Sequence, residues 1–142
     1  MSKATVQAAP IIYPCLSYRD APAAMEWLSR AFGFVKRAAY PAPDGSIMHA
    51  EMSYGAGVIM LGSPHPEKGW VSALDLPAVN QTIYVVVDDP DAHHARAKAA
   101  GAEIVIELKD EDYGSRGYTA RDPEGNYWSF GTYRPGAEWE ES

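Results

Sequence analysis

His49 and Glu51 have the side chains best suited to chemistry in this chain. They stand two residues apart in the segment MHAEM, whose residue types are typical of a β-strand. Alternate side chains of a strand point to the same face of a sheet, so the imidazole and the carboxylate are expected to be neighbours. They could form an acid/base pair, two ligands of a metal ion, or a polar patch on a half-exposed strand. Only the distant His65 could add a further metal ligand.

A second stretch, RDPEGNYWSFGTY at residues 121–133, combines a turn with an aromatic strand. The segment DPEG has a proline and a glycine at the positions that a tight turn favours. In the strand that follows, alternation places Trp128 and Phe130 on one face and Tyr127 and Ser129 on the other. The face with the larger aromatics is predicted to join the core. The Ser129 face is then free of large core aromatics and could contact a ligand.

The composition sets limits on the class of protein. The chain has 142 residues, of which 46% are apolar, so a single domain with a substantial core is expected. A net charge of -7 without Lys or Arg clusters argues against a nucleic-acid or anionic-membrane partner. The one cysteine excludes an internal disulfide framework. No segment is apolar for long enough to span a bilayer, and the N-terminus lacks the apolar core of a signal peptide, so we expect a cytoplasmic protein.

The chain contains an internal repeat. Residues 13–35 and 82–104 each give a strand-like run, an aspartate, a nearby proline, a helical run, a glycine and a second strand-like run. Asp20 and Asp89 are predicted to cap the two helices at their N-termini. Gly33 and Gly101 are predicted to end them.

Three strand-like segments follow each helix, so each half has the order βαβββ. The sequence predicts an α+β protein with a single domain over residues 1–142, made of a module at 11–62, a linker at 63–80 and a module at 81–134. The predicted strands after the helices span residues 34–40, 47–54, 57–61, 103–108, 117–121 and 126–132. The residues predicted to form the core between sheets and helices are Trp27, Leu28, Ile83, Val85, Val87, Trp128 and Phe130.

The tandem βαβββ pattern, together with the segment YTARDPEGNYWSFGTY, resembles the glyoxalase, bleomycin-resistance and ring-cleaving dioxygenase superfamily, whose members are also called vicinal oxygen chelate proteins. The resemblance covers about residues 11–134. It implies two modules whose curved mixed sheets form a cup, with the helices on the outer face. It also implies a homodimer, and a cup that holds a substrate, a drug or a metal.

In the metal-dependent enzymes of this superfamily, four positions on the first and fourth strands of each module carry His or Glu ligands. These positions correspond to Tyr13, Met60, Thr82 and Ser129 in this chain, and none of them is His, Asp, Glu or Cys. A thioether and two neutral hydroxyls are poor ligands for a catalytic divalent ion. We therefore expect neither a metal nor another cofactor.

Residues predicted to face the cup are mainly apolar, aromatic or hydroxyl-bearing, as in a small-molecule pocket, although the same residues could simply fill a closed sheet. Trp70 in the linker could cover the cup or anchor its own loop. The segment YGSRGY contributes Tyr113 and also Arg116, which could bind an anionic group or form a surface ion pair. The residues assigned to the cup by alternation are Tyr13, Cys15, Ser17, Val58, Met60, Thr82, Tyr84, Val86, Tyr127 and Ser129.

The leading functional prediction is a non-enzymatic protein that sequesters an aromatic or amphipathic small molecule without a metal. The alternative is a superfamily enzyme, a lyase, isomerase or dioxygenase, that uses an unorthodox metal site or metal-free acid/base catalysis at His49 and Glu51. A third possibility is a vestigial cup with a surface for a protein partner, for which the sequence offers no positive sign.

Overall fold

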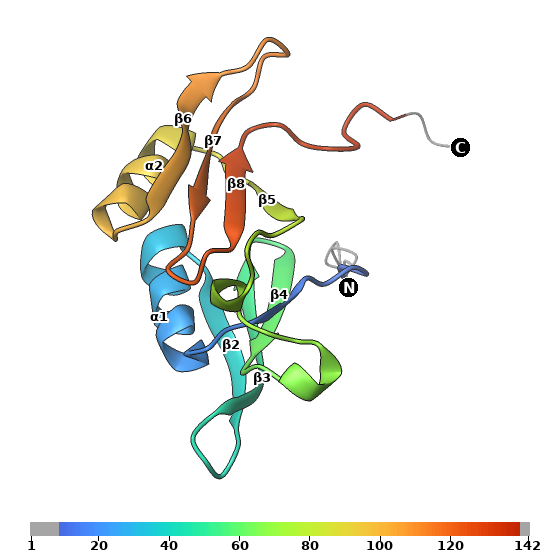
Figure 1. Cartoon of the computed structure of the whole chain (residues 1–142). Helices are drawn as coiled ribbons and strands as arrows, with labels where there is room; N and C mark the ends of the chain where they lie inside the picture. The colour runs from blue at the N-terminus through green and yellow to red at the C-terminus, as the bar shows by residue number, and fades with distance from the viewer. Residues whose placement is uncertain (1–8, 140–142) are drawn as a thin grey trace, which may run out of the picture. The chain divides into compact units, whose positions relative to one another are not determined.

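The computed structural model describes residues 9–139, which divide into two compact units between Leu76 and Pro77. Each unit contains one four-stranded sheet and one helix (Figure 1). Among the described residues, no helix is both long and apolar enough to cross a bilayer.

In the first unit the strand order is β1-β4-β3-β2, with β1 parallel to β4 and the other neighbours antiparallel. Two short 3-10 turns, at Pro66–Lys68 and Ala73–Asp75, follow the sheet. The elements of the unit are β1 (Cys15–Ser17), α1 (Ala21–Phe32), β2 (Val35–Pro41), β3 (Ile47–Tyr54) and β4 (Gly57–Gly62).

The second unit repeats this topology in the order β5-β8-β7-β6, again with one parallel pair, β5 and β8. The predicted α+β class and the tandem βαβββ order are therefore confirmed. The elements are β5 (Thr82–Val86), α2 (Pro90–Ala99), β6 (Glu103–Asp110), β7 (Arg116–Arg121) and β8 (Tyr127–Gly131).

Both helices begin at the predicted aspartate. The Asp20 carboxylate accepts a hydrogen bond of 3.1 Å from the backbone N–H of Ala23, and Asp89 makes the equivalent 3.1 Å bond with Ala92. Gly33 ends α1 in the left-handed conformation, at φ 84°. These local signals explain why the helix boundaries could be predicted from the sequence.

The two helices cover their sheets unequally. The helix α1 buries a continuous apolar face that includes Trp27 and Leu28, whereas α2 buries only Pro90, His93 and Ala97. Trp128, Phe130 and Val87 are buried as predicted. Ile83 and Val85 on β5 are only half-buried, which corrects their assignment to the core; the short α2 packs on β6 and β7 and leaves β5 less covered.

The turn between β7 and β8 is organised by the buried carboxylate of Asp122. One carboxylate oxygen accepts the backbone N–H groups of Glu124 and Asn126, each at 3.0 Å. The other accepts the indole N–H of Trp128 at 3.0 Å and the Asn126 side-chain amide at 3.2 Å. Gly125 completes the turn at φ 93°. The carboxylate thereby ties the turn to the first inward-facing side chain of β8.

We expect Asp122→Asn to lower the free energy of unfolding by about 2 kcal/mol, because one of the two acceptor oxygens becomes an amide that cannot accept the Trp128 indole N–H. Urea denaturation measures the change. Asp88→Asn removes the same charge from an exposed site and is the matched control, with an expected change within about 0.5 kcal/mol. Equal stability of the two variants would show that the Asp122 network is dispensable.

Candidate functional site

A pocket of about 310 Å³ lies in the second unit, over the face of the sheet that α2 does not cover. Side chains on this face alternate along β8 with the buried Trp128 and Phe130, which face α2. The pocket is lined by Tyr84, Ile106, Lys109, Glu111, Tyr113, Ser115, Arg116, Gly117, Tyr118, Thr119, Ser129, Phe130, Gly131 and Tyr133.

One cross-strand row supplies the centre of this surface. Tyr84 pairs with Ser129, Ser129 with Thr119, and Thr119 with Ile106, so the row crosses all four strands. Directly paired residues present their side chains on the same face. The hydroxyl oxygens of Thr119 and Ser129 are 2.7 Å apart and share a hydrogen bond.

The next row is almost bare of side chains, because Gly117 pairs with Gly131. A Cβ on Gly117 would lie 2.5 Å from the Phe130 carbonyl oxygen, a distance that no side chain tolerates. A Cβ on Gly131 would lie 3.0 Å from the Tyr84 hydroxyl oxygen. The two glycines therefore permit a close backbone approach and allow the Tyr84 phenol to lie across Gly131.

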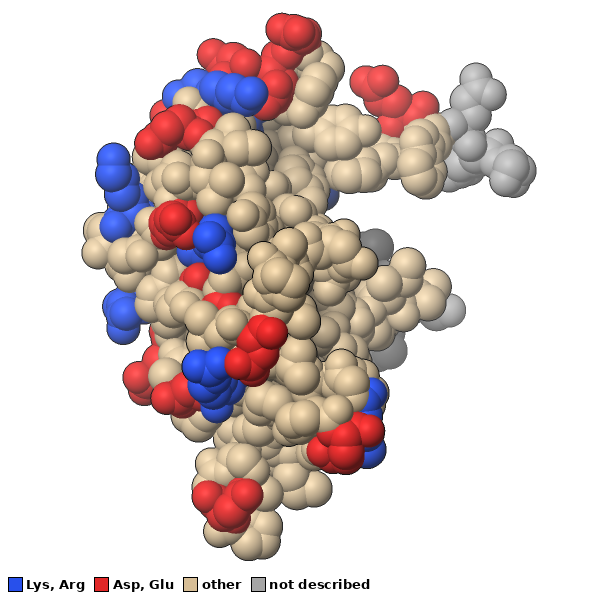
Figure 2. All heavy atoms as spheres, viewed as in Figure 1, with Lys and Arg blue, Asp and Glu red and all other residues tan. Residues whose placement is uncertain are grey.

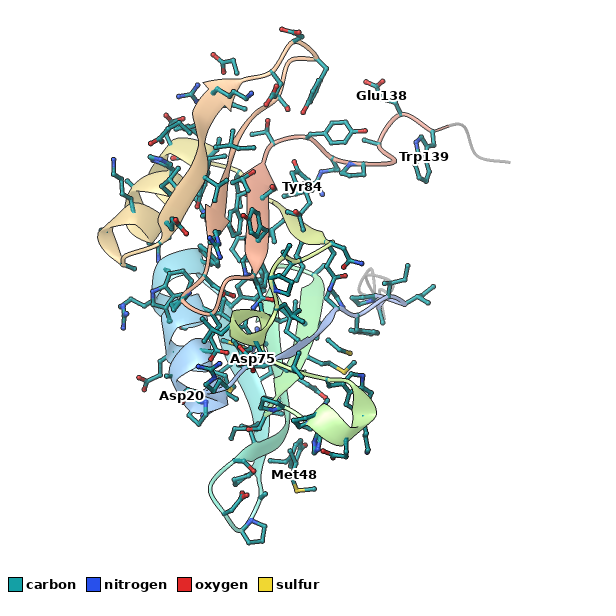
Figure 3. All side chains as sticks on the ribbon, in the orientation of Figure 1. Asp20, Met48, Asp75, Tyr84, Glu138 and Trp139 are labelled. Atoms are coloured by element: carbon teal, nitrogen blue, oxygen red, sulfur yellow. The ribbon has the colours of Figure 1, made fainter. Side chains whose placement is uncertain are left out.

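Three tyrosines surround this bare strip. The Tyr84 hydroxyl donates a 2.6 Å hydrogen bond to the carbonyl oxygen of Tyr133, in the segment that follows β8. Figure 3 labels Tyr84 among the side chains of the second unit. The ring centroid of Tyr133 is 6.5 Å from that of Tyr84 and 5.5 Å from that of Tyr113. Tyr84, Tyr113 and Tyr133 are 39%, 68% and 48% exposed, so their aromatic surface is accessible to a ligand.

Partial burial raises the pKa of Tyr84, and the neighbouring phenols of Tyr113 and Tyr133 raise it further. Tyr84 therefore remains protonated at neutral pH and keeps its hydrogen bond to the Tyr133 carbonyl. This bond joins β5 to the segment after β8 and fixes the position of one aromatic wall.

The charged side chains that line the pocket are engaged with other charges. The Arg116 guanidinium donates two hydrogen bonds of 3.0 Å to Asp91 and one of 3.2 Å to Asp110, and these carboxylates raise the pKa of Arg116. The Lys109 ammonium lies 3.7 Å from Glu111. On the surface seen in Figure 2, basic side chains likewise lie beside acidic ones. Of the two roles predicted for Arg116, the ion pair is the one observed.

Thr82 and Tyr127, also predicted to bind ligand, occupy the neighbouring row on the same face but lie outside the pocket. The Arg121 guanidinium lies over the Tyr127 ring, 5.3 Å from its centroid, and is 3.4 Å from Glu103. Arg121 thus covers one side of the ring. The structure brings Tyr84, Tyr113, Arg116 and Ser129 together, while Thr82 and Tyr127 stand beside them.

His49 and Glu51 lie in the first unit, on the face of β3 opposite α1. The imidazole Nε2 is 2.8 Å from a Glu51 carboxylate oxygen, so the two side chains meet as strand alternation indicates. The Tyr40 ring is nearly parallel to the imidazole, with centroids 6.1 Å apart. Both members of the pair are open to solvent, at 41% and 43% side-chain exposure.

The remaining predicted residues also lie in the first unit. Tyr13 precedes β1 instead of lying within it, and its hydroxyl donates a 2.6 Å hydrogen bond to the Pro10 carbonyl. The residue of β1 that pairs with Met60 is Cys15. Trp70 is 56% exposed and forms a β-bridge with His65.

The ligand positions of the superfamily's metal enzymes do not suit a divalent metal in this chain. Met60 offers a thioether, the Ser129 hydroxyl is bonded to Thr119, and the Tyr13 hydroxyl is bonded to a backbone carbonyl. Within residues 9–139, no three His, Cys, Asp or Glu side chains gather as a metal-binding group. The absence of a metal and of any other cofactor stays a prediction.

Several pocket residues were not identified from the sequence, among them Ile106, Lys109, Glu111, Thr119 and Tyr133. Alternation from Ser129 through Gly131 would have placed Tyr133 on the same side. Thr119 and Ile106 require the register of β7 against β8 and β6, which includes irregularities on β6 that the sequence does not reveal.

We expect Gly131→Ala to displace the Tyr84 phenol and to lower the free energy of unfolding by about 1–3 kcal/mol, since the new methyl group would be 3.0 Å from its hydroxyl oxygen. Urea denaturation checks this. Gly57→Ala is the control, because its Cβ would make only an ordinary 3.4 Å contact. A smaller cost in a Tyr84→Phe background would identify the phenol as the obstacle; an unchanged cost would point instead to the Arg116 carbonyl, 3.1 Å away.

Comparisons with known proteins agree with this architecture. The crystal structure of TioX from Micromonospora sp. ML1 matches with a TM-score of 0.70 and 34% identity, over 86% of this chain and 94% of that chain. The fosfomycin resistance protein FosX from Mesorhizobium loti matches in fold alone, with a TM-score of 0.65 and 11% identity over 91% and 96% of the two chains.

A curated relative, the uncharacterized protein Mb0911c of Mycobacterium bovis, is 33% identical over 125 residues, which are 86% of this chain and 82% of the relative. The sequence model of the glyoxalase/bleomycin resistance protein/dioxygenase superfamily matches residues 11–130. The chain therefore belongs to the glyoxalase/bleomycin resistance protein/dioxygenase superfamily.

Proposed function

We propose that this protein is a non-enzymatic binding protein that captures an aromatic or amphipathic small molecule in the pocket of its second unit, without a metal. The observation that carries this proposal is the arrangement of Tyr84, Tyr113 and Tyr133 around the bare Gly117–Gly131 strip. The aromatic rings offer apolar faces to the pocket of about 310 Å³.

The physical basis of binding would be stacking and burial of apolar surface. Aromatic pairs contribute about 0.5–1.5 kcal/mol beyond the burial of their area. Tyrosine is well suited to this role, because its ring packs against a ligand while its hydroxyl stays hydrated. The hydrogen bond from Tyr84 to the Tyr133 carbonyl fixes one wall before a ligand arrives, which reduces the entropy cost of binding.

Family membership supports the same interpretation, because members of this superfamily typically bind small molecules. The proposal includes a homodimer in the cytoplasm, for which the support is the family resemblance and the composition.

In a calorimetric titration with planar aromatic antibiotics, at least one compound is expected to bind. Tyr113→Ala and Tyr133→Ala should each weaken that binding by roughly tenfold, because each removes an accessible aromatic face. Tyr40→Ala, which removes an exposed tyrosine of the first unit, is the matched control and should bind like the wild type.

Unchanged affinity in both pocket variants would show that the ligand binds elsewhere. A wild-type protein that binds no member of a broad aromatic panel would contradict the proposal.

A second candidate function, an enzyme with acid/base chemistry, is favoured by the contact between His49 and Glu51. A carboxylate bonded to one imidazole nitrogen stabilises the tautomer in which the other nitrogen is unprotonated, and so able to accept a proton. The exposure of the pair leaves it accessible to a substrate. The reaction would be of the lyase or isomerase type if the pair works by acid/base catalysis alone, whereas a dioxygenase would need the unorthodox metal site at the same residues.

If this second function holds, Glu51→Gln should lower kcat for a turned-over substrate by about 10–100-fold, with a smaller change in KM, because the imidazole loses its orienting carboxylate. His49→Ala should remove the activity. Steady-state kinetics with candidate aromatic and carbonyl substrates provide the measurement. Glu67→Gln, at an exposed carboxylate in the turn after the sheet, is the control. Full turnover by both pair variants would exclude acid/base catalysis here.

A further inference from the structure

We infer that the pocket of the second unit selects an uncharged planar ring that carries a hydrogen-bond acceptor at one edge, and that the Thr119 and Ser129 hydroxyls determine this specificity. The inference rests on the proposed function and deepens it. It concerns which aromatic ligands bind, their charge and their orientation.

The two hydroxyls carry two protons, and the hydrogen bond between them uses only one. At 2.7 Å, one hydroxyl donates to the other, so the accepting hydroxyl keeps its own proton. Neither oxygen has a further hydrogen-bond partner among the described residues. Both residues are half-buried in the row between Tyr84 and Ile106. A ligand that covers them must accept this proton or leave a donor unsatisfied.

Leaving that donor unsatisfied has a cost, because a polar group that loses water without gaining a partner is destabilised. A ligand with a carbonyl or ring nitrogen at its edge avoids the cost. A ring of the same shape without an acceptor does not. The site can therefore discriminate between two ligands that bury the same apolar area but differ in whether they carry an acceptor.

The Tyr84 hydroxyl and the charged side chains of the pocket do not compete for the role. The Tyr84 proton is donated to the Tyr133 carbonyl at 2.6 Å. The guanidinium of Arg116 is held by two carboxylates, and Lys109 lies beside Glu111. An anionic ligand would find only cations whose charge is already balanced by nearby carboxylates. A cationic ligand would gain no unpaired carboxylate among the lining residues.

The shape of the site favours a flat ligand. The paired glycines leave bare backbone next to the hydroxyl row, and the rings of Tyr84 and Tyr133 stand beside it. A planar ring that packs against the tyrosines can direct its edge at Ser129 and Thr119. Bulky saturated groups would lose the ring contacts that the tyrosines offer.

Four bicyclic probes of nearly equal size test the inference at pH 8: isoquinoline, which is neutral with an acceptor; naphthalene, which is neutral without one; N-methylisoquinolinium, a cation; and 2-naphthoate, an anion. Each is titrated against the full-length protein and followed by intrinsic fluorescence. Isoquinoline should bind about threefold to tenfold more tightly than each of the other three, the factor that one neutral hydrogen bond provides.

Thr119→Val with Ser129→Ala should remove the preference for isoquinoline over naphthalene while naphthalene affinity stays the same or rises. Ser17→Ala, which removes a half-buried hydroxyl from the first unit's sheet, should leave the preference intact. Circular dichroism verifies that each variant is folded, and the comparison of probes on the wild type needs no variant at all.

The outcomes separate the two proposals. Equal binding of all four probes, or tightest binding of the cation or the anion, overturns the inference and leaves aromatic capture in place. A preference that persists in the double variant overturns the role of the hydroxyl pair. Failure of every probe to bind overturns both the specificity and aromatic capture by this pocket.

Discussion

The geometry of the second unit depends on the hydrogen bonds that the buried carboxylate of Asp122 accepts. It accepts two backbone N–H groups of the turn and the indole N–H of Trp128, so the turn and the start of β8 are held by one residue. A shift of one residue in β8 would exchange its two faces. Ser129 would then leave Thr119, and the pairing of Gly117 with Gly131 would be lost. The pocket therefore depends on a carboxylate that does not line it.

The opposite face of β8 provides the rigidity that the pocket needs. Trp128 and Phe130 are buried, and the His93 ring of α2 lies 4.2 Å from Phe130, centroid to centroid. The same histidine meets the Tyr118 hydroxyl at 2.5 Å. Because consecutive residues of β7 and β8 alternate between this core and the open face, packing on one side fixes the hydroxyl row on the other.

Sequence patterns predicted those structural features that depend on residues close together in the sequence. The capping aspartates, the turn at DPEG and the alternation of Trp128 with Ser129 all follow from local chemistry, and all are present. Contacts between distant segments were harder to foresee. Asp91, one of the two partners of Arg116, comes from α2, and the half-exposure of Ile83 follows from where α2 packs. Neither is encoded within one stretch of the chain.

The two units of the repeat share the same strand register but have side chains of different chemistry at equivalent positions. In the first unit the row Cys15, Met60, Glu51 and Ala38 crosses the sheet in the same way as Tyr84, Ser129, Thr119 and Ile106 in the second. The first row places an ionisable carboxylate beside His49. The second places neutral hydroxyls between a phenol and an aliphatic side chain. Differences at equivalent positions, rather than in the fold, therefore separate the chemistry of the two surfaces.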